Sequence, residues 1–239
     1  MLSRLIEQVE PSVAKVQITT TGGKLVDSGT GVATGPRVIA TCYHVIDPDD
    51  CGRPHRPTIN GEECVVRKTN PSADLALLES KREFPPILPK AFSEVTLGDE
   101  ILFFGYPAGV GNLTVHKGMV SAKGNSLLDR FKNIDMIQID GTVNLGNSGG
   151  PAIDISSGKL IGIVTAKYGP FLNGIYEFKS MVDNFVQQPE GEIGLGSIDQ
   201  GKFTNFTVRG FATLAKPLLL VQVGIGYAVS SDYVVKLQT

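Results

Sequence analysis

The sequence has few cysteines and no apolar run long enough to cross a membrane. Its three cysteines, Cys42, Cys51 and Cys64, are an odd number and lack the spacing of a metal site. We therefore expect free thiols in a reducing compartment and no bound metal. A membrane-spanning helix needs roughly 20 apolar residues, and the short run 218–221 is better explained as a buried strand. The sequence predicts no membrane span.

An excess of charge of one sign is also lacking. The chain has 22 basic and 24 acidic residues, a formal net charge of −2, and no basic run. Proteins that bind nucleic acid or anionic membranes usually carry a basic patch, so we expect neither partner. Glu7 and Glu10 interrupt the apolar core that a secretory signal requires. Together with the free thiols, this predicts a cytoplasmic protein.

Glycine and proline are plentiful, with 28 and 14 residues among 239. This composition is typical of many short strands joined by tight turns, and the length suits one large all-β unit or two small barrels. Helical spacing is confined to 2–9 and 178–187. Strands are predicted at 14–19, 31–34, 37–42, 64–68, 75–79, 100–105, 113–121, 136–140, 159–165, 205–209, 218–223 and 227–229.

The most informative segment is Gly146-Asn147-Ser148-Gly149-Gly150-Pro151. Glycines on both sides of Ser148 let the backbone turn tightly around the hydroxyl, so that the N–H groups of Gly146 and Ser148 can converge on one point. An oxyanion would occupy that point during attack on a carbonyl. The alternative to a catalytic loop is that this segment is only a Gly-rich turn between two strands.

A serine needs a base, and His44 is the best placed of the three histidines. It ends the strand-like run 38–46 just before a turn, whereas His55 lies in a Pro/Arg-rich loop and His116 in a Gly-rich hairpin. The nearby Cys42 is expected in the barrel wall and not as a catalytic thiol. His44 is therefore the predicted base.

A base in turn needs a buried carboxylate that fixes its tautomer. Asp74 opens the apolar run 74–79 after a turn, where burial would hold it rigid. Asp47, Asp49 and Asp50 are nearer to His44 in sequence, but they are typical of a solvated turn. We therefore predict that Asp74 is the partner of His44.

The order of these motifs, A-T-C-Y-H-V around His44, D-L-A-L-L from Asp74 and G-N-S-G-G-P around Ser148, resembles the trypsin/chymotrypsin-like serine proteases. Within them, the chain is most similar to the HtrA/Deg branch. That similarity is carried by further segments: 9–16, 29–32, 104–107, 118–122, 137–151 and 224–229. It covers nearly the whole chain except about 167–223.

The resemblance implies an all-β fold of two six-stranded antiparallel barrels, with the active site in the cleft between them. The single protease domain 1–239 would divide into an N-terminal barrel, 11–97, and a C-terminal barrel, 98–239, with an insertion at about 167–223. It also implies a serine endopeptidase without a cofactor, with His44, Asp74 and Ser148 as catalytic residues. Gly146, Asn147 and Ser148 would form the oxyanion hole. Unlike most of that branch, the chain is expected to lack a PDZ module after the protease domain.

The resemblance further implies which residues contact the substrate. They are Thr142, Val143, Leu145, Thr165, Ala166, Lys167 and Ile225. Thr142 stands where trypsin-type enzymes place an acidic residue, so a preference for Lys or Arg is not expected. Ile225 stands where enzymes with a deep substrate pocket have glycine, so a shallow pocket is expected. The expected substrate residue before the scissile bond is small and aliphatic (Val, Ala, Ile or Thr), while Lys167 leaves an acidic preference as an alternative.

The expected partners are polypeptides, with unfolded proteins among them, and the resemblance links the branch to protein quality control. Two other functions stay open at this point. One is a chaperone-like or binding protein that uses the same cleft, and the other is a latent protease activated by a ligand or by assembly into a homo-oligomer.

Overall fold

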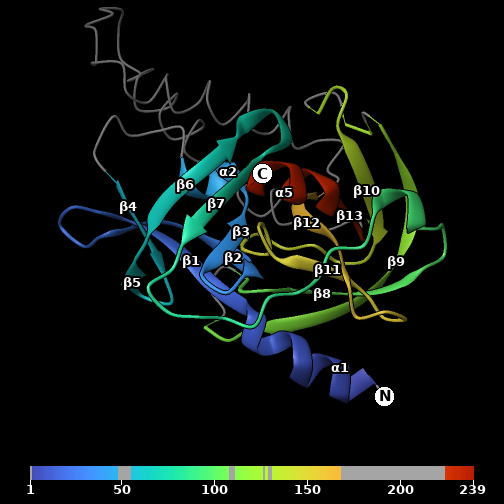
Figure 1. The fold of residues 1–239 in the computed structure, drawn as a ribbon, viewed down its shortest axis with the longest axis horizontal. Coiled ribbons are helices and arrows are strands. Elements are labelled where there is room, and N and C mark those ends of the chain that lie inside the picture. The colour runs from blue at the N-terminus through green and yellow to red at the C-terminus, as the bar shows by residue number, and fades with distance from the viewer. Residues whose placement is uncertain (1, 48–54, 108–110, 126, 129–130, 168–223) are drawn as a thin grey trace, which may run out of the picture. The chain divides into compact units, whose positions relative to one another are not determined.

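The structure is a computed structural model that describes residues 2–47, 55–107, 111–125, 127–128, 131–167 and 224–239 (Figure 1). These residues belong to one compact unit of two β-sheets. The predicted helix at 178–187, the strands at 205–209 and 218–223, and most of the predicted insertion lie outside the described residues.

The first sheet is antiparallel and has seven strands in the order β5-β4-β1-β2-β3-β7-β6. The strands are β1 (Val13–Thr20), β2 (Leu25–Gly35), β3 (Val38–Thr41), β4 (His55–Ile59), β5 (Glu62–Glu63), β6 (Val65–Asn70) and β7 (Leu75–Glu79). Alternate residues of β1, such as Val16 and Ile18, are fully buried, as expected for a strand with one face on a core. Four of the five residues of β7 are buried.

The second sheet is a closed six-stranded antiparallel barrel in the order β10-β13-β12-β11-β8-β9. Its strands are β8 (Glu100–Gly105), β9 (Thr114–Asn125), β10 (Asp135–Asp140), β11 (Pro151–Asp154), β12 (Leu160–Lys167) and β13 (Ile225–Ser230). The predicted all-β double-barrel fold is confirmed, with the difference that the first sheet has seven strands.

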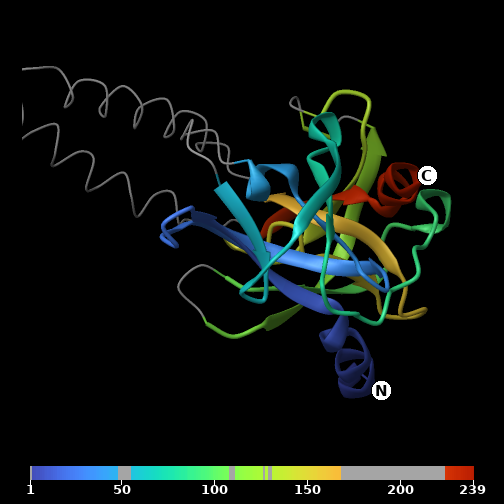
Figure 2. The same ribbon diagram turned by 60° about the vertical axis from the view of Figure 1, so that its left-hand side comes forward.

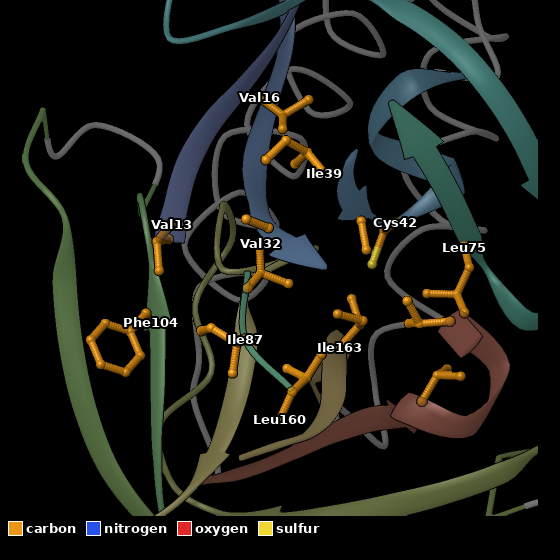
Figure 3. Packing of buried hydrophobic residues seen from close by; sticks show 14 of the residues in the cluster. Val13, Val16, Val32, Ile39, Cys42, Leu75, Ile87, Phe104, Leu160 and Ile163 are labelled. Atoms are coloured by element: carbon orange, nitrogen blue, oxygen red, sulfur yellow. The ribbon is translucent and has the colours of Figure 1, made fainter. Parts of the chain in front are cut away.

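The two sheets share a hydrophobic core. Its buried residues come from the first sheet, for example Val32 and Ile39, and from the second, for example Phe104 and Ile163 (Figure 3). Leu160 belongs to the same cluster. This shared burial of apolar surface fixes the two sheets against each other, and it therefore fixes any site built from both.

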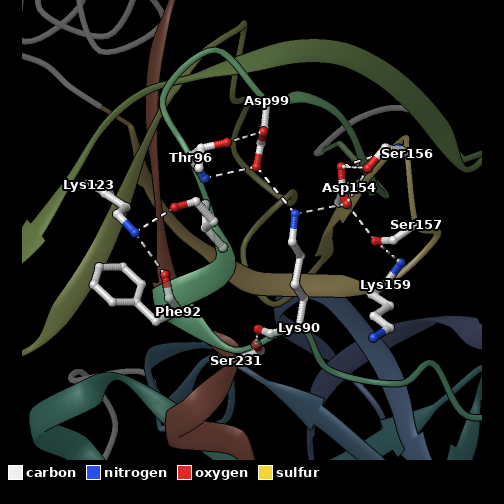
Figure 4. Close-up of polar contacts among 11 residues, drawn as sticks. Lys90, Phe92, Thr96, Asp99, Lys123, Asp154, Ser156, Ser157, Lys159 and Ser231 are labelled. Atoms are coloured by element: carbon white, nitrogen blue, oxygen red, sulfur yellow. Dashed lines mark hydrogen bonds and ion pairs between the residues drawn. The ribbon is translucent and has the colours of Figure 1, made fainter.

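A polar network holds the segment of chain that connects β7 of the first sheet to β8 of the second. Lys90 Nζ lies 3.0 Å from Asp154 Oδ2 and 3.3 Å from Asp99 Oδ2 (Figure 4). The Lys90 backbone donates to Leu160 O at 2.8 Å, and its carbonyl accepts from Ser231 Oγ. Burial raises the pKa of Asp154, but hydrogen bonds from neighbouring serines and from Lys90 lower it by more. The pKa of Asp154 therefore lies below its usual value. The connection is thus anchored on the barrel by charge and backbone bonds.

Short helices complete the unit. They are α1 (Leu2–Val9), α2 (Tyr43–Ile46), α5 (Ser231–Gln238) and the 3₁₀ turns η1 (Glu10–Ser12), η2 (Pro71–Ala73) and η3 (Phe92–Glu94). The terminal helices α1 and α5 lie apart in both views (Figure 1 and Figure 2). Among the described residues, no helix has the length and apolar character needed to cross a bilayer.

Two local expectations were wrong. His44 lies in the one-turn helix α2 and not at the end of a strand, and His55 lies in β4 and not in a loop. The apolar run 38–46 contains a change from strand to helix that its composition alone does not mark. β4 contains Pro57, which is unusual in a strand interior, and tertiary pairing with β1 overrides that signal.

Candidate active site

His44 is held by a one-turn helix that follows β3 directly. Its neighbour Val45 is 1% exposed and anchors the turn in the core, whereas the His44 side chain is 44% exposed. Tyr43 N donates to Asp74 O at 3.0 Å, which ties the start of α2 to the residue before β7. The backbone of His44 is therefore fixed, and its imidazole is open to solvent on one side.

Asp74 is buried and oriented by its own backbone. It follows η2 in a left-handed conformation with φ 51° and ψ 44°, which Asp tolerates better than most residues. Asn70 caps the preceding turn by accepting a hydrogen bond from Ala73 N at 3.1 Å. This local conformation directs the carboxylate toward α2, and its side chain is only 10% exposed.

The Asp74 carboxylate accepts three hydrogen bonds. His44 N donates to Oδ1 at 2.9 Å, His44 Nδ1 lies 2.7 Å from Oδ2, and the Thr165 hydroxyl also donates to Oδ2. Burial raises the pKa of Asp74, but the donors of His44 and Thr165 together lower it below its usual value. An ionised Asp74 requires that Nδ1 carry a proton, which leaves Nε2 of a neutral His44 free to act as a base.

The Ser148 loop is held between the two sheets. Ser148 O accepts from Thr30 N at 2.8 Å on β2, while Gly149 N donates to Val164 O at 2.7 Å on β12. Thr30 Oγ1 donates to Gly146 O at 2.7 Å and accepts from Tyr106 N at 2.9 Å. Backbone bonds from both sides thus fix the loop that carries the serine.

The same loop lies beside the turn that carries His44. A Cβ placed on Gly29 of β2 would lie 2.7 Å from Val45 Cγ2 and 2.9 Å from Ser148 O. Only glycine therefore allows β2 to approach both α2 and the Ser148 loop. This close packing brings Ser148 into the neighbourhood of the His44–Asp74 pair, and a hydrogen bond between Ser148 Oγ and His44 Nε2 stays a prediction.

The backbone turns tightly on both sides of Ser148, as the glycine pattern predicts. Gly146 has φ 92° and Gly149 has φ 86°. Within the described part of the chain, no acceptor is bonded to the N–H of Gly146 or of Ser148, so both are available to a ligand. Asn147 is fully buried, and its side-chain amide has no hydrogen-bond partner there.

The predicted substrate-contacting residues come from three neighbouring segments. Gly141 N donates to Gly224 O at 2.7 Å, which brings the start of the segment 142–145 beside the start of β13, where Ile225 is partly buried. Across β12 and β13, Ala166 pairs with Tyr227 and Lys167 with Gly226.

The exposure of these residues varies. Val143 is 4% exposed and Leu145 is 47% exposed. Thr142 is exposed, whereas Thr165 is buried against Asp74. Val143 is therefore packed in a buried apolar cluster of the second barrel, whereas Thr142 and Leu145 face solvent.

Cys42, His44 and Asp74 offer sulfur, nitrogen and oxygen atoms within 4.8 Å of one another. The carboxylate is occupied by hydrogen bonds, and the Cys42 thiol donates to Val164 O at 3.2 Å. Burial, and then the charge of Asp74, raise the pKa of this thiol well above its ordinary value. Because metals bind the thiolate, these residues are better suited to orienting His44 than to holding a cation.

Thr30 is the functional residue that sequence reasoning missed. Its hydroxyl links Gly146 of the Ser148 loop, 116 residues further along the chain, to Tyr106, 76 residues further along. A hydroxyl between two glycines, Gly29 and Gly31, is the one signal that could have drawn attention to it. The sequence alone indicated only a strand of small residues.

Comparison with known proteins places the chain in a family. The family model of the trypsin-like peptidase domain matches residues 29–163, which include His44, Asp74 and Ser148. Because this match covers more than half of the chain, the protein belongs to the trypsin-like peptidase domain family. The resemblance to serine proteases of this class is confirmed.

Individual relatives support the HtrA/Deg branch. The chain is 34% identical over 142 residues to a probable periplasmic serine endoprotease DegP-like from Chlamydia trachomatis serovar D, covering 58% of this chain and 28% of that protein. It is 41% identical over 104 residues to one of the same name from Bartonella henselae, covering 43% and 20%. The chain thus spans less than a third of the length of these relatives.

Solved structures share the fold. The HtrA-type protease AlgW with tripeptide matches with a TM-score of 0.66 at 22% identity, over 100% of this chain and 62% of that chain. The serine endoprotease from Yersinia pestis matches with a TM-score of 0.61 at 22% identity, over 100% and 65%. At this identity, the matches support the fold alone.

The expected cytoplasmic location is contradicted by these relatives, which are named as periplasmic. The expectation gave too much weight to reduced thiols. Cys42 is free and fully buried, and Cys64 is free and partly buried. A thiol shielded in a core can stay reduced in an oxidising compartment, so its redox state does not identify the compartment.

Proposed function

We propose that this protein is a serine endopeptidase that hydrolyses peptide bonds through a triad of Ser148, His44 and Asp74. The observation that carries the proposal is the buried Asp74 carboxylate, which accepts from both the backbone and the ring of His44. Such a carboxylate holds the imidazole in one tautomer and stabilises the imidazolium that forms during proton transfer. The sequence match to a trypsin-like peptidase domain supports the same reaction.

The mechanism follows from these positions. Ser148 Oγ attacks the peptide carbonyl carbon while His44 Nε2 takes the hydroxyl proton. The C–N bond then breaks as His44 returns that proton to the leaving amine, and an acyl-enzyme ester is left on Ser148. Water, deprotonated by His44, attacks the ester and releases the new carboxylic acid, and the proton returns to Ser148. No step uses a cofactor.

The oxyanion of each tetrahedral intermediate would be stabilised in the loop 146–148. The N–H groups of Gly146 and Ser148 are unoccupied among the described residues, and the positive φ of Gly146 sets the direction of the first. Asn147 N donates to Asn144 O at 3.1 Å and its carbonyl accepts from Gly150 N at 2.9 Å, so its proposed role is to hold the shape of the loop. One such donor is worth roughly 10²–10³ in rate in other serine proteases.

A phosphonylating reagent tests the nucleophile directly. We expect a fluorophosphonate to modify Ser148 and no other residue, because only this hydroxyl has a base and an oxyanion site beside it. Intact-mass and peptide-mass measurements should locate one adduct, and Ser148→Ala should abolish it. An absence of adduct under conditions that label an active serine protease would overturn the proposal.

The proposed substrates are polypeptides, unfolded chains among them, with a small aliphatic residue before the scissile bond. Thr142 carries no charge to pair with Lys or Arg, and buried Val143 adds apolar surface. Ile225 at the start of β13 lies next to the segment that holds both. A β-branched side chain there leaves room only for a short substrate side chain.

Trimming Ile225 tests this specificity. For Ile225→Gly we expect kcat/KM for peptides with Phe before the scissile bond to rise by about tenfold relative to Val peptides, the scale of pocket discrimination by apolar volume. Ile225→Val keeps the branch and should leave the ratio unchanged. A wild-type peptide-library profile dominated by basic residues would contradict the assignment.

A further inference from the structure

Asp27 is a carboxylate on the inner face of β2, two residues before Gly29. It faces Ile18 across the β1–β2 pair, and Ile18 is fully buried. Directly opposed residues of an antiparallel pair point to the same face. Gly29 lies on this face too, because side-chain direction repeats every two residues, and the Cβ direction of Gly29 points at Val45 beside His44. Asp27 is therefore directed to the core side of β2, near α2.

The Asp27 carboxylate is half-buried and lacks a counter-charge among the described residues. Its Oδ1 accepts from Ser28 N at 2.7 Å, and none of the ion pairs in that part of the chain includes it. Burial raises the pKa of Asp27, while the Ser28 N–H and the charge of His44 lower it, with a net rise.

The position of β2 indicates which part of a substrate Asp27 would face. The loop 148–150 is bonded to β12 on one side, through Val164, and to β2 on the other, through Thr30. The proposed contacts for the residue before the scissile bond, Ala166 and Ile225, belong to β12 and β13. The portion of the substrate that leaves with the amine therefore extends toward β2 and Asp27.

We propose that Asp27 makes the enzyme favour Lys or Arg directly after the scissile bond, a selectivity that rests on the proposed endopeptidase function. A carboxylate without a protein partner among the described residues can pair with an ammonium or guanidinium group brought by the substrate. Both side chains are long enough to reach past the reacting atoms. Because the carboxylate is only half-buried, solvent screening limits the preference to about three- to tenfold.

The test uses pairs of quenched fluorescent peptides that differ only in the residue after the scissile bond. For the wild type, kcat/KM should be about three- to tenfold higher with Lys than with Gln. Asp27→Asn keeps the acceptor for Ser28 N and should bring this ratio to about one, with turnover of the Gln peptide retained. Asp27→Lys should reverse the preference in favour of Glu. Glu7→Gln on α1 removes the same charge elsewhere and should leave the ratio unchanged.

The outcomes separate this inference from the function on which it rests. A wild-type ratio near one, or a ratio that survives in Asp27→Asn, overturns the role of Asp27 while fluorophosphonate labelling of Ser148 leaves the endopeptidase proposal intact. Failure of that labelling, with no peptide cleaved by any variant, overturns both. A ratio that also falls in Glu7→Gln assigns the effect to net charge and overturns the role of Asp27.

Discussion

Replacing Asp74 by Asn should lower kcat by about 10⁴-fold at neutral pH, the effect of the equivalent change in a well-studied serine protease. The carboxylate accepts from the N and Nδ1 of His44 and from Thr165 Oγ1. An amide can present an N–H to Nδ1, which favours the tautomer with its proton on Nε2. His44 could then no longer accept the proton of Ser148.

The measurement is steady-state hydrolysis of a peptide ester or amide, with thermal unfolding as a check on folding. Asp47→Asn provides the matched control, because Asp47 lies at the end of α2 and accepts from the Tyr43 hydroxyl without contacting Nδ1. It should retain activity within a few-fold. A loss below tenfold in a folded Asp74→Asn protein would exclude Asp74 as the residue that orients His44.

Replacing Gly149 by Ala should destabilise the protein by about 3–5 kcal/mol, combining a left-handed non-glycine residue with overpacking. Gly149 has φ 86°, and a Cβ there would overlap Thr30 O and Thr41 Oγ1. The loop cannot move aside easily, because backbone bonds hold it to β2 and β12. Peptidase activity should be lost together with stability.

Urea unfolding of Gly149→Ala and Gly61→Ala separates the two causes. Gly61 has a similar φ of 84°, but no atom lies within 4 Å of the position that a Cβ would take there. Its replacement should therefore cost only about 1 kcal/mol, the backbone contribution alone. Equal destabilisation of the two variants would show that the predicted overlap at Gly149 is relieved by movement of the loop.

Elements with a strong local signal could be predicted from the sequence. The helix α1 and the strands β7 and β8 have the bounds that their periodicity indicated. The one-turn helix α2 could not, because four residues within the largely apolar run 38–46 do not distinguish a helical turn from a strand. The tight turn around Ser148 could also be predicted, because glycine adopts a positive φ such as those at Gly146 and Gly149 without strain.

Contacts between segments that are distant in the sequence were harder to predict. Asp27 is one of several acidic residues, and only its pairing with Ile18 shows that it faces the core. β5 has only two residues, Glu62 and Glu63, and depends on β4 for its hydrogen bonds, so the Asn60-Gly61 turn before it is the one local signal of this hairpin. Such features follow from tertiary pairing and not from local preference.

The order in which the barrel is completed has a consequence for biosynthesis. β13 closes the second barrel by pairing with both β10 and β12, yet it is the last of the barrel's strands to be synthesised. A ribosome-bound chain that has already exposed His44, Asp74 and Ser148 still lacks this strand. The loop of Ser148 is held by β12, whose other edge then has no partner. We therefore expect the nascent chain to be unable to cut itself or its neighbours until β13 has been synthesised and paired.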